Sequence, residues 1–401
     1  MRFYEFEAKR LLARQGIAVP PGKTANTPSE AEAIANELGT PVVVKAQVLF
    51  GNVEQAGGVK VATSPAQAKQ HAEAILALTI NGKKPKCVLI EKAIDSAKEF
   101  SLRATYDGIV KLPVLIASDV GGKDIDDITD SNPDRVKRRH FSTLYPQTGY
   151  RAKELAKELG LSGGALTGLT GVLSKLAEVL LRYDLTVADI TRLAQTADGK
   201  LVAADVHMDL EIEGRNRQKP ILQEFGIDPN DLRLPRTPTP FDDEGVKIDK
   251  EDPRGVAGPI LEFDGNIGLV IGAGGGSLTT FDAVRKHGGR PANYAAIGGN
   301  PSVRKAQRLT KLVLSKPGVE KIAVISNVVS NTRADLVARG VIKGVLELGL
   351  EPSKVITIFR VPGAWEADAF KILEKYGVEY CDRTVSISEA AKRAVQKIGK
   401  A

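Results

Sequence analysis

A repeated order of strand, loop and helix in the last third of the chain places the strongest limit on its fold. The order occurs three times, with strand-like segments at 267–271, 321–326 and 354–359 and helix-like segments at about 278–288, 333–348 and 366–376. Such alternation is typical of a parallel, doubly wound α/β sheet. Because ligands of these sheets bind at the carboxyl ends of the strands, we expect a binding site where the three strands end.

The loops after these strands contain residues suited to bind an anion. The first loop reads Gly-Ala-Gly-Gly-Gly-Ser, the second holds two residues that we expect to cap the next helix with their side chains, and an arginine follows the third strand. Helix N-termini carry roughly half a positive charge and free N–H groups, and arginine pairs with carboxylates. We therefore predict a substrate site formed by Gly274, Gly275, Ser277, Asn331, Thr332 and Arg360. The alternative is a tight glycine turn, ordinary helix capping and a surface arginine.

The first half of the chain follows a different pattern. Strand-like segments at 41–48, 86–94, 110–118 and 200–208 mix with helix-like segments without strict alternation, which indicates an α+β domain. A stretch at 226–256 is rich in Pro and Asp and has no sustained periodicity. The sequence therefore predicts a domain at 1–240, a linker at 241–260 and a second domain at 261–401.

Composition limits the class of protein. The 401 residues carry a formal net charge of +7, but the basic residues are dispersed apart from 134–141 and only 5% of residues are aromatic. We therefore expect anionic small molecules rather than nucleic acid as ligands. We see no long apolar run, no signal peptide and only two cysteines, so we expect no membrane span and a cytoplasmic protein.

Charged residues near the expected strands of the first half indicate a nucleotide site. Lys45 lies in a buried strand that leads into a glycine-containing loop, a setting that suits phosphates. Glu91 stands at a strand end, and Glu99 follows eight residues later. A hairpin turning at 196–200 would set Asp189 and Asp205 on adjacent strands as a Mg²⁺ pair. Taken singly, each acidic residue is better explained as a solvated strand end.

Several segments together resemble the β subunits of the succinyl-CoA synthetase family, which also includes citryl-CoA synthetase and ATP-citrate lyase. They include MRFYEFEAKRLLARQGIAVPPG at the N-terminus, VVKAQV…AGGVKV, and DGNIG followed by the glycine-rich turn and HGGRPANY. The resemblance implies an ATP-grasp domain followed by a flavodoxin-like ligase domain, and ADP-forming ligation of an acid to CoA. It also implies a partner α subunit that binds CoA and carries a phosphorylated histidine. The four histidines of this chain are isolated in sequence, so none of them is a candidate for that role.

The resemblance also implies roles for single residues. Lys45, with the loop that begins at Gly51, would hold the phosphates of ATP or ADP, and Glu91 and Glu99 would meet adenine and ribose. Asp205 with Thr191 would hold Mg²⁺, and Asp189 would orient the partner's histidine. Two departures from the family pattern weaken this site. Thr191 replaces the usual asparagine, and Gly-Asn-Val-Glu at 51–54 replaces Gly-Arg-Gly-Lys.

The loop at 329–335, Val-Ser-Asn-Thr-Arg-Ala-Asp, looks more like the citrate-binding part of ATP-citrate lyase than like succinate-using members. Side-chain donors at Ser330, Asn331 and Thr332 would suit citrate. The resemblance thus favours a β-type subunit that forms citryl-CoA, with a partner that either stands alone or is fused to a citrate synthase-like lyase module. The alternatives are a succinyl-CoA or malyl-CoA synthetase β subunit and a non-catalytic regulatory subunit.

Overall fold

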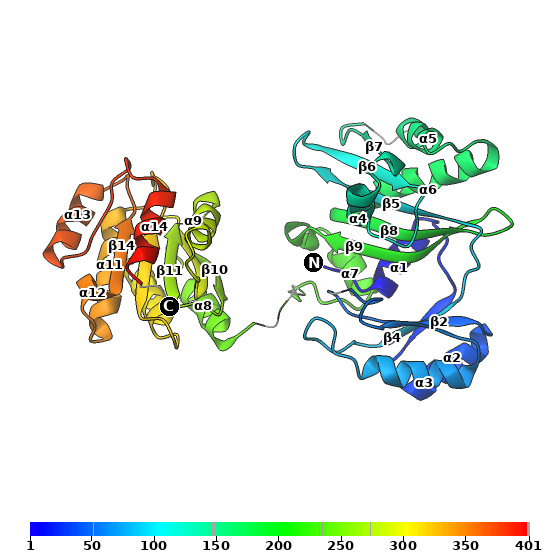
Figure 1. Cartoon of the computed structure of the whole chain (residues 1–401), viewed down its shortest axis with the longest axis horizontal. Coiled ribbons are helices and arrows are strands. Elements are labelled where there is room, and N and C mark those ends of the chain that lie inside the picture. The colour runs from blue at the N-terminus through cyan, green and yellow to red at the C-terminus, as the bar shows by residue number, and fades with distance from the viewer. Residues whose placement is uncertain are drawn as a thin grey trace. The chain divides into compact units, whose positions relative to one another are not determined.

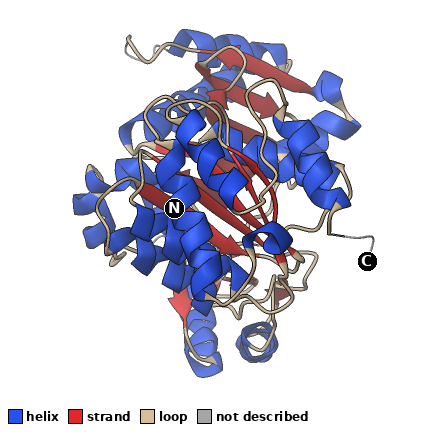
Figure 2. Cartoon of the chain, turned by 90° about the vertical axis from the view of Figure 1, so that its left-hand side faces the viewer, coloured by secondary structure: helices blue, strands red, loops and turns tan. Residues whose placement is uncertain are grey.

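The computed structural model describes residues 1–50, 52–145, 149–231, 233, 236, 238–272 and 274–398. The chain divides into two compact units, Met1–Pro235 and Arg236–Ala401 (Figure 1). Helices flank the strands in both units (Figure 2). We describe each unit by itself.

The N-terminal unit contains a small four-stranded antiparallel sheet. Its strand order is β1 (Gly22–Ala25), β4 (Val88–Lys92), β2 (Val42–Ala46) and β3 (Val59–Ala62). The helices α2 (Pro28–Leu38) and α3 (Pro65–Leu76) pack against it. Both helices start at a capping hydroxyl, since Thr27 and Ser64 accept hydrogen bonds from backbone N–H groups three residues ahead.

A five-stranded antiparallel sheet forms the rest of this unit. Its order is β7 (Val136–His140), β6 (Leu112–Ser118), β5 (Lys98–Asp107), β8 (Leu185–Gln195) and β9 (Leu201–Leu210). The accompanying helices are α1 (Glu5–Arg14), α4 (Ile125–Ser131), η1 (Pro133–Arg135), α5 (Gly149–Glu158), α6 (Gly163–Arg182), η2 (Ile212–Asn216) and α7 (Lys219–Glu224). Ile190, Val206 and Met208 belong to the apolar core, so alternation places Asp189 and His207 on the opposite, polar face.

The helix α6 is long and apolar enough to cross a membrane, by length and composition only. Six of its residues are buried, and they belong to the core of the five-stranded sheet: Leu169, Leu173, Leu176, Ala177, Val179 and Leu180. The helix therefore has the packing of a core helix in a folded domain.

The C-terminal unit confirms the predicted doubly wound fold. Its order is β10 (Val256–Glu262), β12 (Asn293–Gly298), β11 (Ile267–Gly272), β13 (Lys321–Ile325) and β14 (Ile356–Arg360). The last four are parallel, and β10 is an antiparallel edge strand. Helices form cores on both faces of the sheet, with α8 (Pro240–Lys250), α10 (Val303–Leu314), α11 (Ala334–Glu347), α12 (Pro352–Val355) and α13 (Glu366–Lys375) on one, and α9 (Gly275–Lys286) and α14 (Ile387–Gln396) on the other.

The segment 241–260, which we expected to be a linker, instead contributes α8 and β10 to the second unit. Thr239 caps α8 by accepting a hydrogen bond from the Asp242 N–H, and Pro240 occupies the first helical turn. Proline and aspartate at a helix start look like linker composition in a sequence. The boundary between the units lies earlier, between Pro235 and Arg236.

Candidate functional site

Lys45, the residue predicted to hold phosphates, ends in a buried cluster of charged groups. Its Nζ lies 2.6 Å from Glu5 Oε1 on α1 and donates to the Ala204 carbonyl at 2.7 Å. Asp205 Oδ1 lies 3.5 Å away, and that side chain is half exposed. The helix α1 thus supplies a carboxylate that the sequence-based prediction of this site did not include.

Glu91, expected to meet adenine or ribose, belongs to the same cluster. Both of its carboxylate oxygens accept from Lys9 Nζ, at 2.7 and 2.6 Å. Lys9 Nζ also lies 2.8 Å from Glu5 Oε1 and donates to the Ala204 carbonyl at 2.9 Å. Glu91 is buried, and a buried carboxylate needs a cation or hydrogen-bond donors. The structure therefore pairs Glu91 with Lys9 instead of presenting it to a base or sugar.

The network keeps its central groups charged at neutral pH. Burial raises the pKa of Glu5, but Lys45 and Lys9 outweigh it and lower the pKa to about 2. Burial lowers the pKa of Lys45, yet Glu5, Asp205 and Glu91 raise it above its ordinary value. Burial raises the pKa of Glu91 in spite of the two lysines.

Glu99 lies on β5 and has partners of its own. Its carboxylate accepts from Ser96 Oγ at 2.6 Å and from Arg192 Nε at 2.8 Å. Burial raises the pKa of Glu99, but these two donors lower it below its usual value. Arg192 lies opposite Asp205 in the β8–β9 register, so the Glu99–Arg192 pair lies beside the strand position of Asp205.

Asp189 and Asp205 lie on adjacent strands, as predicted, but not opposite each other. Asp189 pairs with His207 in the register, and an irregularity between Ile190 and Arg192 contains Thr191. Arg103 on β5 grips the buried Asp189 with two hydrogen bonds, from Nε at 2.7 Å and Nη2 at 2.8 Å. Asp189 and Asp205 therefore do not form the predicted Mg²⁺ pair, because the charge of the Asp189 carboxylate is already balanced by Arg103.

His207 lies between two carboxylates on the polar face of the sheet. Its Nδ1 is 3.7 Å from Asp189 Oδ2, and its Nε2 is 3.4 Å from Asp209 Oδ2. Burial lowers the pKa of His207, but the two carboxylates outweigh it and raise the pKa to about 9. His207 is thus an imidazolium at neutral pH. Asp209 lies two residues from His207 on the same face of β9, and the strand register adds Asp189 from β8.

Gly51 lies outside the described residues. Within the part of the chain that the structure describes, no group of three or more His, Cys, Asp or Glu side chains could hold a metal ion. Mg²⁺ commonly uses one or two protein carboxylates plus phosphate oxygens and water. The half-exposed Asp205 fits that requirement, with Thr191 as the neighbouring neutral residue.

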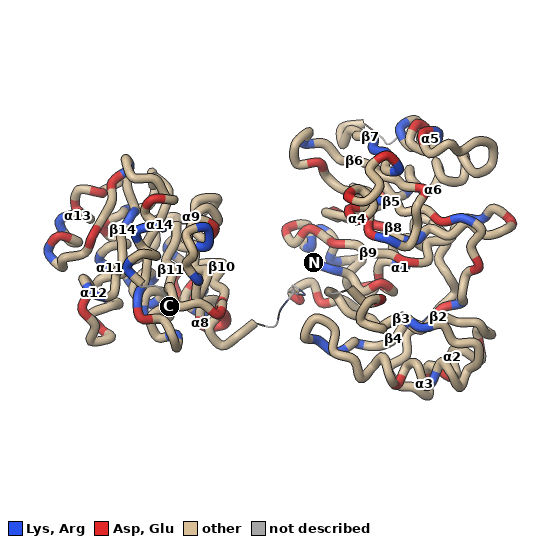
Figure 3. The backbone as a smooth tube through the Cα atoms, in the orientation of Figure 1, with Lys and Arg blue, Asp and Glu red and all other residues tan. Residues whose placement is uncertain are grey.

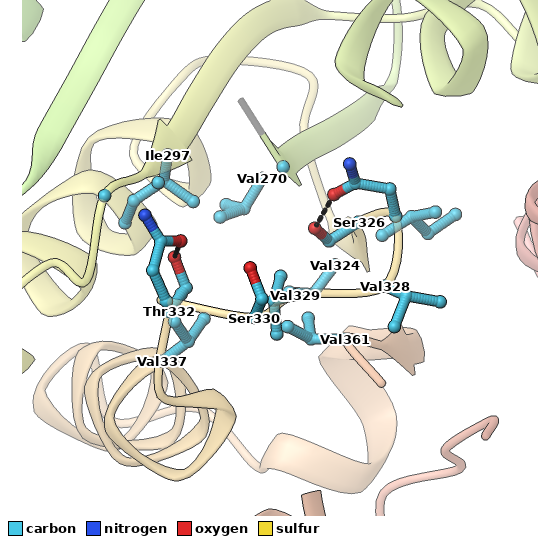
Figure 4. Close-up of a pocket in the computed structure, with 16 residues that line it drawn as sticks. Val270, Ile297, Val324, Ser326, Val328, Val329, Ser330, Thr332, Val337 and Val361 are labelled. Carbon is cyan, nitrogen blue, oxygen red and sulfur yellow. Dashed lines mark hydrogen bonds between the residues drawn. The ribbon is translucent and has the colours of Figure 1, made fainter. Parts of the chain in front are cut away.

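The C-terminal unit has a pocket of about 190 Å³ at the carboxyl ends of its parallel strands (Figure 4). Apolar side chains from the strands and α11 line one part of it, including Val270, Ile297, Val324, Val337 and Val361. Polar groups come from the loop after β13, where the Ser330 hydroxyl points into the pocket. All 16 lining residues are uncharged types.

Asn331 and Thr332 line this pocket, as predicted, but they do not cap the following helix. The helix α11 begins at Ala334, and its N-cap is Arg333 without a side-chain capping bond. Thr332 Oγ1 instead accepts from the Asn300 N–H at 3.1 Å and donates to Asn331 Oδ1 at 3.4 Å. The bond from the Asn300 N–H ties the loop after β13 to the loop after β12.

The glycine-rich turn serves mainly packing and chain direction. A Cβ on Gly272 would lie 2.0 Å from Ser326 Oγ, so β11 could not approach β13 as closely. Gly274 has a φ of 74°, which favours glycine. A Cβ on Gly275 would meet no protein atom within 4 Å. Ser277 is buried and bonded to the Gly274 carbonyl and the Tyr294 hydroxyl, both at 2.5 Å.

Arg360 does not face the pocket as a carboxylate clamp. It is buried, its Nε donates to the Val385 carbonyl at 2.6 Å, and its Nη1 donates to the Ser326 carbonyl. Its position at the end of β14 was predicted, but its partners are backbone groups far along the chain. Of the six predicted substrate residues, the pocket therefore contains Asn331 and Thr332.

Comparisons with known proteins agree with this architecture. A family model described as an ATP-grasp domain matches residues 2–195. The chain is 37% identical over 405 residues to the succinate–CoA ligase [GDP-forming] subunit beta of Thermus thermophilus, with all of both chains covered. It is 31% identical to the [ADP-forming] subunit beta of Methanothermobacter thermautotrophicus, with 99% of both covered.

Among solved structures, the chain resembles ATP citrate lyase from Methanothrix soehngenii in complex with citrate and coenzyme A. The TM-score is 0.67 at 18% identity, and the match covers 98% of this chain and 99% of the other. At this identity the likeness establishes a shared fold.

Proposed function

Because this chain belongs to the family of succinate–CoA ligase β subunits, we propose that it is the β-type subunit of a nucleotide-dependent ligase that joins a small carboxylic acid to CoA. The observation that carries the proposal is the 37% identity over the full length of both chains. In this proposal the N-terminal unit binds ATP or GTP, and the C-terminal unit binds the acid.

Lys45 contributes a permanently charged ammonium to the nucleotide phosphates. Asp205 and the neutral Thr191 hold Mg²⁺, which neutralises phosphate charge. The side chains of Arg103 and His207 both lie against the Asp189 carboxylate and supply positive charge. Asp189 is therefore better suited to position these two side chains than to bind a metal ion. The proposed site thus has one carboxylate for the metal, that of Asp205, whose Oδ1 lies 3.5 Å from Lys45 Nζ.

The phosphoryl carrier comes from a partner α-type subunit, which also binds CoA. His207 lies on the polar face of the sheet, but a pKa of about 9 keeps it protonated and therefore poorly nucleophilic. His140 accepts or donates at Asp107 Oδ2, and His287 pairs with Ser388. In the proposed sequence the γ-phosphoryl group passes to the partner's histidine and then to the acid, and CoA displaces phosphate from the acyl phosphate.

We propose succinate as the acid. Two observations support this choice. The relatives described above are succinate–CoA ligase subunits. The Arg360 guanidinium donates to backbone carbonyl groups, so it does not bind a second carboxylate of citrate. Citrate is the second candidate, because Ser330, Asn331 and Thr332 line the pocket with hydroxyl and amide groups. In that case the partner could carry a fused lyase module.

Reconstitution with an α-type subunit tests this function. We expect acyl-CoA formation that requires both subunits, Mg²⁺ and nucleotide, with succinate giving the higher kcat/KM. The chain alone should form none. Higher kcat/KM with citrate would select the second candidate, and turnover by the chain alone would contradict the two-subunit proposal.

A further inference from the structure

Two buried lysines of the N-terminal unit share the same three acceptors. Lys9 Nζ lies 2.8 Å from Glu5, 2.6 Å from Glu91 and 2.9 Å from the Ala204 carbonyl oxygen. Lys45 Nζ lies 2.6 Å from Glu5, 3.6 Å from Glu91 and 2.7 Å from the same carbonyl. The side chains of Lys9 and Lys45 are 5% and 10% exposed.

This sharing matters because a buried carboxylate that loses its cation is strongly destabilised. Lys45 is fully engaged by protein atoms, so it must give up partners to contact a phosphate. If Lys45 were the sole cation beside Glu5 and Glu91, its movement would leave the Glu5 carboxylate without a cation. Since Lys9 contacts every acceptor of the pair, Glu5, Glu91 and the Ala204 carbonyl all keep a donor when Lys45 turns away.

The two lysines are not equivalent. Lys9 is fixed by both oxygens of Glu91. The longest of Lys45's shared contacts is to Glu91, and Lys45 also reaches the half-exposed Asp205 at 3.5 Å. The Lys45 ammonium therefore lies at the solvent-facing side of the cluster, and the Lys9 ammonium lies inside it.

We propose that Lys9 is a positioning residue for nucleotide binding: it takes over the acceptors of Lys45 and so frees the Lys45 ammonium for a nucleotide phosphate. The inference rests on the proposed function only in placing the nucleotide phosphates at Lys45. A purely structural lysine would neutralise Glu91 and stabilise the fold without affecting the availability of Lys45.

Nucleotide affinity of the purified full-length chain separates these two roles. Kd values for Mg·ADP by calorimetry and thermal midpoints would be measured for wild type, Lys9→Met, Lys9→Arg and Lys45→Met. We expect Lys9→Met to weaken binding by about tenfold or more, the loss of one charge-assisted hydrogen bond. Lys9→Arg, which keeps the cation, should stay within about threefold of wild type. The matched control Lys23→Met removes an exposed lysine paired with Glu37 and should change neither value.

The double variant Lys9→Met/Glu5→Gln keeps the test decisive if Lys9→Met alone does not fold. It removes one cation and one carboxylate together, so Glu91 and Lys45 remain as a balanced pair of opposite charges. We expect it to recover most of the lost affinity. A Lys9→Met variant with a lowered thermal midpoint but wild-type Kd would overturn the inference, as would failure of the folded double variant to recover. Wild-type binding by Lys45→Met would instead refute the nucleotide placement in the proposed function.

Discussion

The two candidate sites of this chain differ in their charged residues. In the N-terminal unit, basic and acidic residues are interleaved along β5, β8, β9 and α1 (Figure 3), and ion pairs join Glu5 to Lys9 and Lys45, and Arg103 to Asp189. In the C-terminal unit, the pocket at the ends of the parallel strands is lined by uncharged residues. The first arrangement offers a ligand ionic groups, and the second offers hydroxyl, amide and backbone groups.

This difference predicts which amino-acid substitutions each unit tolerates. Within an ion network, removal of one charge leaves another buried and unpaired, so its members depend on each other. The close approach of β11 and β13 beside the neutral pocket depends instead on shape, because Gly272 leaves no room for a Cβ. Removal of a charge from the buried ion network should therefore destabilise the N-terminal unit, and a methyl group added at Gly272 should destabilise the C-terminal unit.

The largest effect is expected for Arg103→Ala. It leaves the buried Asp189 without its bidentate partner and should destabilise the N-terminal unit by about 3–5 kcal/mol. The single tryptophan of the chain, Trp365, lies in the C-terminal unit, so its fluorescence reports that unit separately. We expect the far-ultraviolet circular dichroism transition to move while the tryptophan transition stays. Equal shifts of both would show that the units do not respond separately.

Gly272→Ala is the counterpart in the C-terminal unit. The new Cβ would lie 2.0 Å from Ser326 Oγ, and we expect a loss of about 3 kcal/mol, seen in the tryptophan transition. Gly275→Ala, three residues further along, meets no protein atom and serves as the matched control. If both variants unfold like wild type, the close approach of β11 and β13 does not limit this unit.

A pH dependence is expected only from the charged site. The folded-state pKa of His207 is about 9, above its ordinary value, so its contribution to stability is complete below about pH 6.5 and is lost as pH rises through 9. Because a third of the side chain is exposed, we expect about 1–2 kcal/mol. Urea unfolding of wild type and His207→Gln between pH 6 and 10 measures this. The idea fails if the difference in unfolding free energy between the two is constant over that range.

The sequence predicts the fold better than it predicts side-chain partners. The strands expected at 267–271, 321–326 and 354–359 agree with β11, β13 and β14 to within two residues at either end. The strand β12 was not predicted, because Asn-Tyr-Ala-Ala-Ile-Gly lacks a strand pattern. The helix α10 was not predicted either, although its buried residues recur at helical spacing. Asn293 is buried there because its amide bonds both the N–H and the carbonyl of Leu269 on β11.

Partners far apart in the chain account for the errors in the sites. Lys45 bonds to residues 40 and 159 positions away, and Arg360 to residues 34 and 25 positions away. Local patterns correctly marked both as unusual, but they contain no information about which groups a side chain meets after folding. The Glu-Lys pair at Glu5 and Lys9 was visible as an i,i+4 pair on an amphipathic helix, which more often indicates a solvent-exposed salt bridge.

The most direct test of two separate sites is a pair of steady-state KM values measured on the ligase reconstituted with an α-type subunit. Lys45→Met should raise the KM for nucleotide by tenfold or more and leave the KM for the acid within about twofold. Ser330→Ala should raise the KM for the acid several-fold and leave that for nucleotide unchanged. A Ser330→Ala enzyme with an altered nucleotide KM, or a Lys45→Met enzyme altered only toward the acid, would contradict the assignment of the nucleotide to the charged unit and the acid to the neutral pocket.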